Sequence, residues 1–380
     1  MIANLILGSL ALLSLALTLW QWLVARRFPL HQRGTASSLA PHPALSLLKP
    51  LKGCDPATED CLRSWFTQQY PGPTQILFGV VDAEDPVCGI VRTLLQEFPQ
   101  ADAQLVVCGP PRGTNAKVCQ LVELERLARH DLLIISDADV RVPPDLLANL
   151  VAPLQQPEVG LVNCFYRLAN PTTLAMHWEA VAVNADFWSQ VLQSASLKPI
   201  DFALGAVMAT GRKQLAETGG FSALVDYLAD DYQLGHRLAR RGYRLALSPV
   251  VVECWSAPMG WSAVWKHQLR WARTIRVCQP VPYFFSILSH ATLWPLLWLL
   301  AKPGALVAAV ALLCCLTRVL TALNLEQRLT RTPPPCARGW LVPVKDLLQT
   351  AIWLLAFLGN RIEWRGQRLR LRPDGTLLRG

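Results

Sequence analysis

Two aspartates, Asp137 and Asp139, directly follow an apolar run at 132–135 in the segment LLIISDADVRVPPD. A continuous run of Leu and Ile is typical of a strand covered on both faces, and the prolines at 143 and 144 prevent its regular continuation. The two acids therefore lie at the carboxyl end of the strand, where open α/β sheets bind ligands. Residues two apart on an extended chain point the same way, so the carboxylates could hold one hard cation. An Asp-x-Asp triplet alone equally suits a solvated turn.

Further acids stand beside other expected elements. Asp82 follows the strand-like run FGVV and so reaches the same edge of a parallel sheet as Asp137, one strand over. Asp230 and Asp231, in LADDY, begin a segment whose apolar positions recur at helical spacing. Because acids in a first helical turn commonly cap free backbone N–H groups, one of this pair, Asp230, is interpreted as a cap.

Candidate cations come from HQLRW at 267–271 and NAK at 115–117. The planar guanidinium of Arg270 is suited to binding phosphate oxygens. Considered alone, however, Arg270 is equally consistent with an arginine that snorkels at a membrane surface. Trp271 alone would pass as an interfacial tryptophan. Lys117 is a weaker phosphate candidate, because a lysine on a helix face is commonly only solvated.

The elements that must position these residues alternate between strand-like and helix-like segments from Leu45 to about Arg167. Such alternation indicates βαβ units and a mostly parallel sheet, so the predicted class is α/β. The strand-like segments are LSLLKPLKG, QILFGVVD, QLVVCG and DLLIISD, and the helix-like ones are CLRSWFTQQ, GIVRTLLQEF and residues 115–129. Beyond them, GLVNCFYR is a strand candidate, 173–193 is a helix candidate, and DFALGAVMATGRKQL leads from a strand or loop into a helix.

Residues 2–24 contain no charged side chain. At ~1.5 Å per residue they are long enough to cross a ~30 Å hydrocarbon core. A cleaved signal peptide is disfavoured, because no basic residue precedes the apolar run whereas Arg26 and Arg27 follow it. The positive-inside rule then predicts an integral membrane protein whose main domain faces the cytoplasm, as in a bacterial inner membrane or its equivalent.

The C-terminal third is apolar again. Residues 283–301 and 304–324 are typical of a helical hairpin, and 340–360 is a third candidate interrupted by Lys345 and Asp346. If all three cross, the basic C-terminus lies outside, which the positive-inside rule disfavours, so an interfacial or re-entrant last segment is expected. The expected domains are an anchor at 1–25, a linker at 26–44, an α/β domain at 45–280, C-terminal membrane helices at 281–360 and a basic tail at 361–380.

The formal net charge of +9 raises nucleic acid as a partner. Many basic residues, however, lie beside apolar segments rather than in one stripe with aromatic residues, so a membrane surface and no nucleic acid is expected. The eleven cysteines include no C-x-x-C pair. Their spacing fits neither a zinc site nor a disulfide framework, and they are interpreted as small core residues.

Taken in order, Asp82, the DxD triplet, Asp231 and HQLRW resemble the "D, DxD, D, (Q/R)xxRW" signature of membrane-bound inverting glycosyltransferases of the GT-A fold. With NAK and the tail WRGQRLRL, the sequence is most similar to ceramide glucosyltransferases and hopanoid-associated glycosyltransferases. The resemblance spans about residues 45–371 and implies a Rossmann-like, GT-A catalytic domain. The sequence departs from the pattern where Q or R is usual, since His267 stands there with Gln268 beside it.

The resemblance also implies roles. Asp231 would be the general base, and Asp139 would be the protein's ligand to Mg²⁺ or Mn²⁺. Trp271 would close the acceptor side of the cleft. The residues expected to bind the nucleotide sugar are Asp82 at the uridine, Asp137 at the ribose or metal, Lys117, His267 or Gln268, Arg270 and Trp271.

The sequence therefore predicts inverting transfer of a hexose from a UDP-sugar to the hydroxyl of a membrane lipid on the cytoplasmic face. UDP-glucose and a ceramide-like lipid are favoured, and a hopanoid N-acetylglucosaminyltransferase is the alternative. A processive polysaccharide synthase needs a polymer channel, for which three or four apolar segments are few. A catalytically inert membrane scaffold with the same fold is a further alternative, but the presence of Asp139, Asp231 and Arg270 argues against it.

Overall fold

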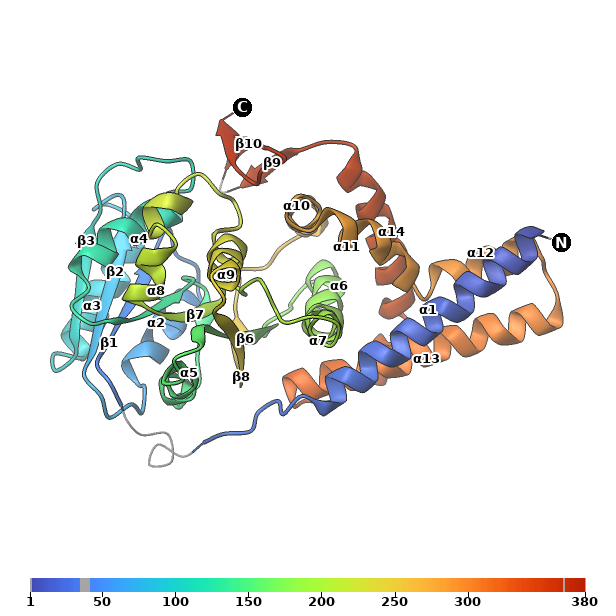
Figure 1. Ribbon diagram of the computed structural model, residues 1–380, viewed down its shortest axis with the longest axis horizontal. Helices are drawn as coiled ribbons and strands as arrows, with labels where there is room; N and C mark the ends of the chain where they lie inside the picture. The colour runs from blue at the N-terminus through green and yellow to red at the C-terminus, as the bar shows by residue number, and fades with distance from the viewer. Residues whose placement is uncertain (1, 35–41, 365, 380) are drawn as a thin grey trace.

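The computed structural model describes residues 2–34, 42–364 and 366–379. Figure 1 shows an α/β part built around one sheet and a helical part from which α1 (Ile2–Arg27) and α13 (Ala305–Thr330) project side by side. The N-terminus lies at the end of this projection farthest from the sheet (Figure 1). The linker predicted at 26–44 falls partly on residues 35–41, which are outside the described residues.

An eight-stranded sheet forms the centre of the α/β part. Strands β3, β2, β1 and β4 run parallel to one another, and so do β6 and β8, whereas β7 and the short β5 are antiparallel to their neighbours. The predicted mostly parallel sheet is thus confirmed. In sheet order the strands are β3 (Asp102–Val107), β2 (Thr74–Val80), β1 (Leu45–Pro50), β4 (Leu132–Ser136), β7 (Val207–Gly211), β6 (Val159–Leu168), β8 (Arg244–Cys254) and β5 (Val140–Arg141).

Helices cover both faces of this sheet. Successive strand residues point to opposite faces, so Leu47 and Ile134 join one core while Leu48 and Leu133 join the other, and all four are fully buried. The first core lies under α2 (Thr58–Phe66), α3 (Val87–Glu97) and α5 (Leu146–Leu154). The second lies under α4 (Ala116–Leu127), α8 (Arg212–Glu217), the 3₁₀ turn η3 (Phe221–Leu224) and α9 (Asp230–Arg240).

Three helices among the described residues are long and apolar enough to cross a membrane: α1, α13 and the segment Cys336–Phe357. The last contains the turn η5 (Cys336–Arg338) and α14 (Leu341–Phe357). A fourth candidate is a pair bent by 54°, formed by α11 (Pro280–Phe285) with η4 (Ser286–Ser289) and by α12 (Leu293–Ala301). Helices α1 and α12 touch where Trp298 lies over Gly8 and donates a hydrogen bond to Asn4 Oδ1 at 2.8 Å.

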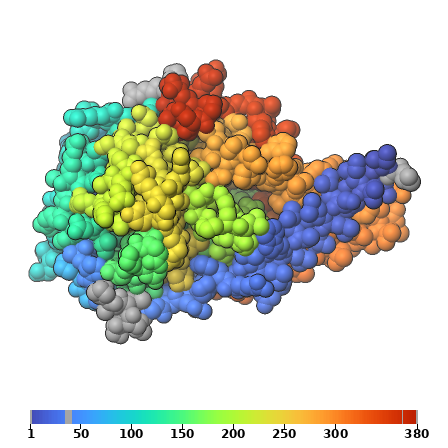
Figure 2. Space-filling view, viewed as in Figure 1, coloured from blue at the N-terminus to red at the C-terminus, as the bar shows by residue number. Residues whose placement is uncertain are grey.

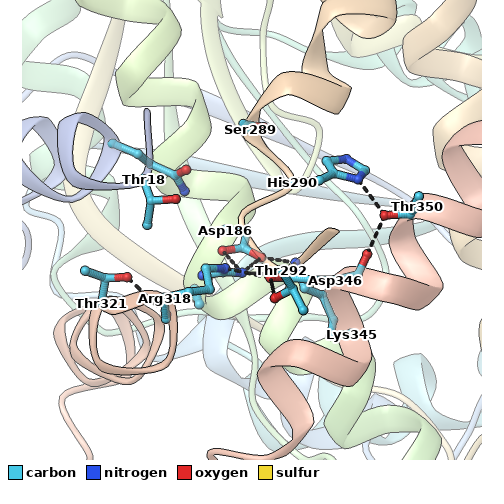
Figure 3. A network of polar contacts seen from close by, with 12 residues as sticks. Thr18, Asp186, Ser289, His290, Thr292, Arg318, Thr321, Lys345, Asp346 and Thr350 are labelled. Carbon is cyan, nitrogen blue, oxygen red and sulfur yellow. Dashed lines mark hydrogen bonds and ion pairs between the residues drawn. The ribbon is translucent and has the colours of Figure 1, made fainter. Parts of the chain in front are cut away.

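A buried network of charges joins the apolar helices to the α/β part (Figure 3). Arg318 of α13 contacts Asp186 at 2.8 Å and Asp346 of α14 at 2.9 Å, and Lys345 contacts the same two carboxylates. Asp186 belongs to η2 (Ala182–Phe187), a π-helical turn between α6 (Leu174–Val181) and α7 (Trp188–Ala195). Each cation lies between two anions, so the four buried charges balance. A cavity of about 40 Å³ beside them is large enough for ordered water.

The segment predicted only as a basic tail contains a second sheet. Strands β9 (Arg361–Trp364), β10 (Gln367–Leu371) and β11 (Leu377–Arg379) pair antiparallel. Leu369 and Leu371 alternate with exposed arginines and pack with Ile362 against Leu228, which precedes α9. Figure 2 shows these C-terminal residues (red) resting on the yellow and orange segments of α9 and α10 (Trp261–Cys278).

Candidate active site

Asp82 and Asp137 lie beyond the carboxyl ends of parallel strands β2 and β4, at the edge predicted from the sequence. They are not on neighbouring strands, however, because β1 lies between β2 and β4 in the sheet. The prediction that Asp82 is one strand from Asp137 is therefore wrong. Asp82 is exposed, and its carboxylate accepts the backbone N–H of Glu84 at 3.0 Å.

The DxD triplet forms a turn, not extended chain. Its two carboxylates consequently differ in surroundings: Asp137 Oδ1 lies 2.7 Å from Lys117 Nζ, while Asp139 is exposed. The backbone N–H of Trp255, at the end of β8, donates to the carbonyl oxygen of Asp139 at 2.9 Å. Within the described residues, no three His, Cys, Asp or Glu side chains gather as a metal cage. One accessible carboxylate nevertheless fits Mg²⁺ or Mn²⁺, since such ions commonly share one or two carboxylates with substrate phosphates.

Lys49, at the end of β1, contacts the backbone of this turn, and it was not predicted from the sequence as a residue of the site. Its ammonium donates to the carbonyl oxygen of Asp137 at 2.6 Å and to Ser136 Oγ at 3.3 Å, and it lies 5.0 Å from the centroid of the Trp65 ring. Burial lowers the pKa of Lys49 to about 8. A lysine inside an otherwise apolar strand is the only signal of such a partner in the sequence.

Lys117 connects the DxD turn to the start of α9. Its Nζ lies 2.7 Å from Asp137 Oδ1 and 3.2 Å from Asp230 Oδ2, and the residue is only 7% exposed. Burial disfavours its charge, but the two carboxylates outweigh burial and raise the pKa of Lys117. The interpretation of Lys117 as a solvated helix residue is therefore wrong. Its neighbour Asn115 caps α4 and donates to the carbonyl oxygen of Tyr227 at 2.8 Å.

Asp230 and Asp231 begin α9, as predicted, and Asp231 Oδ1 accepts the backbone N–H of Tyr232 in the first turn at 2.8 Å. Ala229 occupies the N-cap position, and Asp230 is turned towards Lys117. The interpretation of Asp230 as a cap is thus wrong. Burial, followed by repulsion from Asp230, raises the pKa of Asp231 to about 6. A Cβ added at Gly205 would lie 2.7 Å from Asp231 Oδ2, so the absence of a side chain there makes room for this carboxylate.

The HQLRW residues lie on α10 and divide between two of its faces. His267, Arg270 and Trp271 are spaced i, i+3 and i+4, and such residues share one helix face. Gln268 instead continues the buried stripe of Val264 and Ala272, and is 5% exposed. The geometry therefore groups His267, and not Gln268, with Arg270 and Trp271.

Glu179 of α6 binds two residues of α10 and was not predicted from the sequence as a residue of the site. Its buried Oε1 lies 2.6 Å from His267 Nδ1 and accepts from Gln268 Nε2 at 2.9 Å. Trp271 in turn contacts three aromatic rings, with centroid distances of 4.8 Å to His267, 6.0 Å to Phe187 and 6.4 Å to Tyr166. No local sequence pattern signals Glu179, because its partners are nearly ninety residues away.

A family model described as Glycosyl transferase family 21 matches residues 6–377. The chain belongs to this family. The match covers the α/β part, the apolar helices and most of the C-terminal sheet, so the resemblance drawn from Asp82, the DxD triplet, Asp231 and HQLRW is confirmed at the level of the family.

The curated proteins similar to this chain include ceramide glucosyltransferases and an N-acetylglucosaminyltransferase. Over 215 residues the chain is 29% identical to ceramide glucosyltransferase 1 of Caenorhabditis elegans, covering 54% of this chain and 44% of that protein. Ceramide glucosyltransferase 3 of the same organism is 23% identical over 348 residues, covering 88% of this chain and 74% of the relative. An N-acetylglucosaminyltransferase of Mesorhizobium japonicum is 23% identical over 255 residues, covering 63% of this chain and 58% of the relative.

Among solved structures, a mannosyltransferase from Pyrobaculum calidifontis in complex with GDP-Man and Mn²⁺ superposes with a TM-score of 0.57 at 20% sequence identity. The superposition covers 93% of this chain and 97% of the mannosyltransferase. At this identity the likeness concerns the fold, and it confirms the predicted GT-A-like architecture.

Proposed function

We propose that this chain transfers a hexose from a UDP-sugar to the hydroxyl of a membrane lipid, with inversion, on the cytoplasmic face. The observation that carries the proposal is the Lys117 bridge at 2.7 and 3.2 Å, which holds the DxD turn and the start of the Asp231 helix side by side. UDP-glucose and a ceramide-like acceptor are favoured, because relatives named ceramide glucosyltransferase match the chain.

Asp231 is the general base of the proposed reaction. It takes the proton of the lipid hydroxyl while that oxygen bonds to the anomeric carbon and the bond from this carbon to the diphosphate oxygen breaks. A single in-line displacement of this kind inverts the anomeric configuration. Because its pKa is raised to about 6, Asp231 is a stronger base than an ordinary aspartate yet still ionised at neutral pH.

The remaining residues are assigned to the nucleotide sugar. Asp139 is the protein ligand to Mg²⁺ or Mn²⁺, which when bound offsets the charge of the departing diphosphate. Arg270 and His267 share the helix face that we assign to the phosphate oxygens, so His267 fills the Q/R position. Lys117 acts through Asp137 and Asp230, to which it is bonded, and not on phosphate directly. Asp82 and Asp137 are assigned to the uridine and ribose, and Trp271 to the acceptor side.

An N-acetylhexosamine is the second candidate for the transferred sugar, because one bacterial relative is named an N-acetylglucosaminyltransferase. The deciding experiment incubates the detergent-extracted protein with UDP-glucose, UDP-galactose or UDP-N-acetylglucosamine and total membrane lipid. Mass spectrometry of the products then identifies donor and acceptor together. Elongating polymer would indicate a synthase, and no product from any donor would support the inert scaffold.

Asp231→Asn and Asp230→Asn form the matched pair for the base. Asparagine keeps the shape of aspartate but cannot accept the proton, so Asp231→Asn is expected to lower kcat by ~10²-fold or more while UDP binding is retained. Asp230→Asn, which leaves the base intact, is expected to keep most of the transfer activity at pH 8. Equal loss in the two variants would contradict the assignment of Asp231.

A further inference from the structure

Tyr166 lies among the motif residues although it belongs to none of the motifs. It stands near the carboxyl end of β6, in GLVNCFYR, and pairs in register with Val252 of β8. Its ring is held by two aromatic neighbours from other elements: Phe187 of η2 at 5.5 Å and Trp271 of α10 at 6.4 Å between centroids. The orientation of Tyr166 is thus set by packing around its ring.

The hydroxyl of Tyr166 forms no hydrogen bond within the part of the chain that the structure describes. Burial, with smaller contributions from Cys254, Asp231, Asp137 and Glu179, raises the pKa of this phenol well above its ordinary value. It therefore stays protonated and can donate a hydrogen bond, but it cannot replace Asp231 as base. Strand β6 pairs with β8, whose end contacts the DxD turn through the Trp255 N–H, and the Tyr166 ring contacts Trp271 of α10. Tyr166 therefore lies between the DxD turn and the HQLRW helix.

An in-line displacement places the anomeric carbon between the base and the leaving group. Under the proposed function, Asp231 marks the acceptor side of this line and the DxD turn marks the diphosphate side. Tyr166, on the strand next to β8 and in ring contact with Trp271, borders the space between these two sides. Carboxylates can only accept hydrogen bonds, whereas the neutral Tyr166 hydroxyl can donate one to a sugar oxygen.

We propose that the Tyr166 hydroxyl donates a hydrogen bond to one hydroxyl oxygen of the transferred hexose and so helps to select the donor sugar. This inference rests on the proposed function and extends it to the choice of hexose. A site that pairs with a substrate hydroxyl discriminates strongly against a sugar lacking it, because its own polar group is then left unpaired. The lipid hydroxyl is the rival partner of Tyr166.

The test uses Tyr166→Phe, which removes the hydroxyl and keeps the ring that packs on Phe187 and Trp271. Tyr243→Phe is the matched control, because the hydroxyl of Tyr243 bonds to Glu217 at 2.9 Å outside the site. For each protein kcat/KM is measured with UDP-glucose and with its 2-, 3-, 4- and 6-deoxy analogues. UDP binding and thermal unfolding are measured in parallel, so that a folding defect is recognised.

With UDP-glucose, Tyr166→Phe is expected to lower kcat/KM by ~10- to 10²-fold, and Tyr243→Phe to leave it unchanged. For one deoxy analogue, the wild type and Tyr166→Phe should be equally slow, because the contact is already absent. An equal loss for all four analogues would show that Tyr166 does not contact the hexose, and a loss confined to the KM of the lipid would assign it to the acceptor. If the wild type transfers glucose and Tyr166→Phe does so at the same rate, only this inference fails; a wild type that transfers no sugar would overturn the proposed function as well.

Discussion

The raised pKa of Asp231 predicts the direction in which the rate of sugar transfer changes with pH. Under the proposed function Asp231 must be ionised to act as the base, so kcat/KM is expected to rise with pH and to level off above an apparent pKa of about 6. Asp230 raises the pKa of Asp231 and Lys117 lowers it. Asp230→Asn should therefore move the acid limb to lower pH, and Lys117→Met should move it to higher pH. Shifts in the same direction for both variants would contradict this electrostatic account.

The same shift has a consequence for stability. The pKa of Asp231 is higher in the folded chain than the ~3.9 of an unfolded aspartate. Its protonated form therefore stabilises the fold below about pH 4, and this contribution is lost as the pH rises through about 6. The ionised form of Asp231 that the proposed mechanism needs therefore lowers the stability of the fold at neutral pH.

Asp139 carries the prediction for the metal. Asp139→Asn removes the charge proposed to bind a hard cation, so activity is expected to fall by ~10²-fold or more and the Mn²⁺ concentration for half-maximal activity to rise. Asp137→Asn is the control, because Asp137 is engaged by Lys117 at 2.7 Å. It should lower activity without changing the Mn²⁺ requirement. Undiminished wild-type activity in EDTA would remove the metal from the proposed mechanism.

The acids were predictable from the sequence because each follows an apolar run or begins a helix, and both features are local. The partners of these residues were not predictable in the same way. Lys117 meets Asp230 over a separation of more than one hundred residues, and Glu179 meets His267 over nearly ninety. The sequence analysis also predicted that Asp82 lies one strand from Asp137. This prediction failed because the order of strands along the chain does not give their order in the sheet.

At the scale of elements, the sequence analysis predicted those strands and helices whose apolar residues follow one clear pattern, such as β4, α3 and α9. It did not predict β8, whose run RLALSPVVVEC is interrupted by Pro249, nor the π-helical turn η2 inside the helix expected at 173–193. The C-terminal sheet was missed because its arginines dominate the composition of the segment. Its alternating Leu369 and Leu371 are the signal that a strand was present.

The charge network between α13, α14 and η2 makes a prediction about packing. Arg318→Met leaves Asp186 and Asp346 with Lys345 alone, and breaking a buried pair by removing one partner costs ~3–5 kcal/mol. A lower thermal midpoint in detergent is therefore expected. Adding Asp346→Asn to Arg318→Met restores neutrality and should recover part of the lost stability. A double variant no more stable than the single one would show that charge balance is not what the network supplies.

At the scale of the whole molecule, the chain joins an α/β domain to apolar helices through α10, η2 and the C-terminal sheet. The Lys266 ammonium of α10 meets Glu363 of β9 at 2.9 Å, and the backbone N–H of Leu377 donates to the carbonyl oxygen of Asp226 at 2.7 Å. The C-terminal sheet thus contacts both the HQLRW helix and the segment before Asp231. Composition and hydropathy indicate the two parts, but only the folded chain shows that its last residues join them.

The proposed orientation can be tested with cysteines that the chain already contains. Cys54 and Cys336 are exposed. Cys54 belongs to the α/β part, and Cys336 follows the end of α13 that lies nearer to it. Arg26 and Arg27 at the end of α1 predict that this side is cytoplasmic. The connection between α12 and α13, which contains Gly304, lies at the opposite end of α13 (Figure 1). A Cβ added at Gly304 meets nothing within 4 Å.

In right-side-out membrane vesicles, a maleimide that cannot cross the membrane is expected to label Gly304→Cys but neither Cys54 nor Cys336. After permeabilisation all three should react, which mass spectrometry of the peptides would show. The wild-type chain is the control for labelling at position 304. Labelling of Cys54 in sealed vesicles would place the α/β part outside the cytoplasm. Because UDP-sugars are made in the cytoplasm, that result would also remove the basis for assigning them as donors. Labelling of Cys336 alone would instead revise only the path of α13.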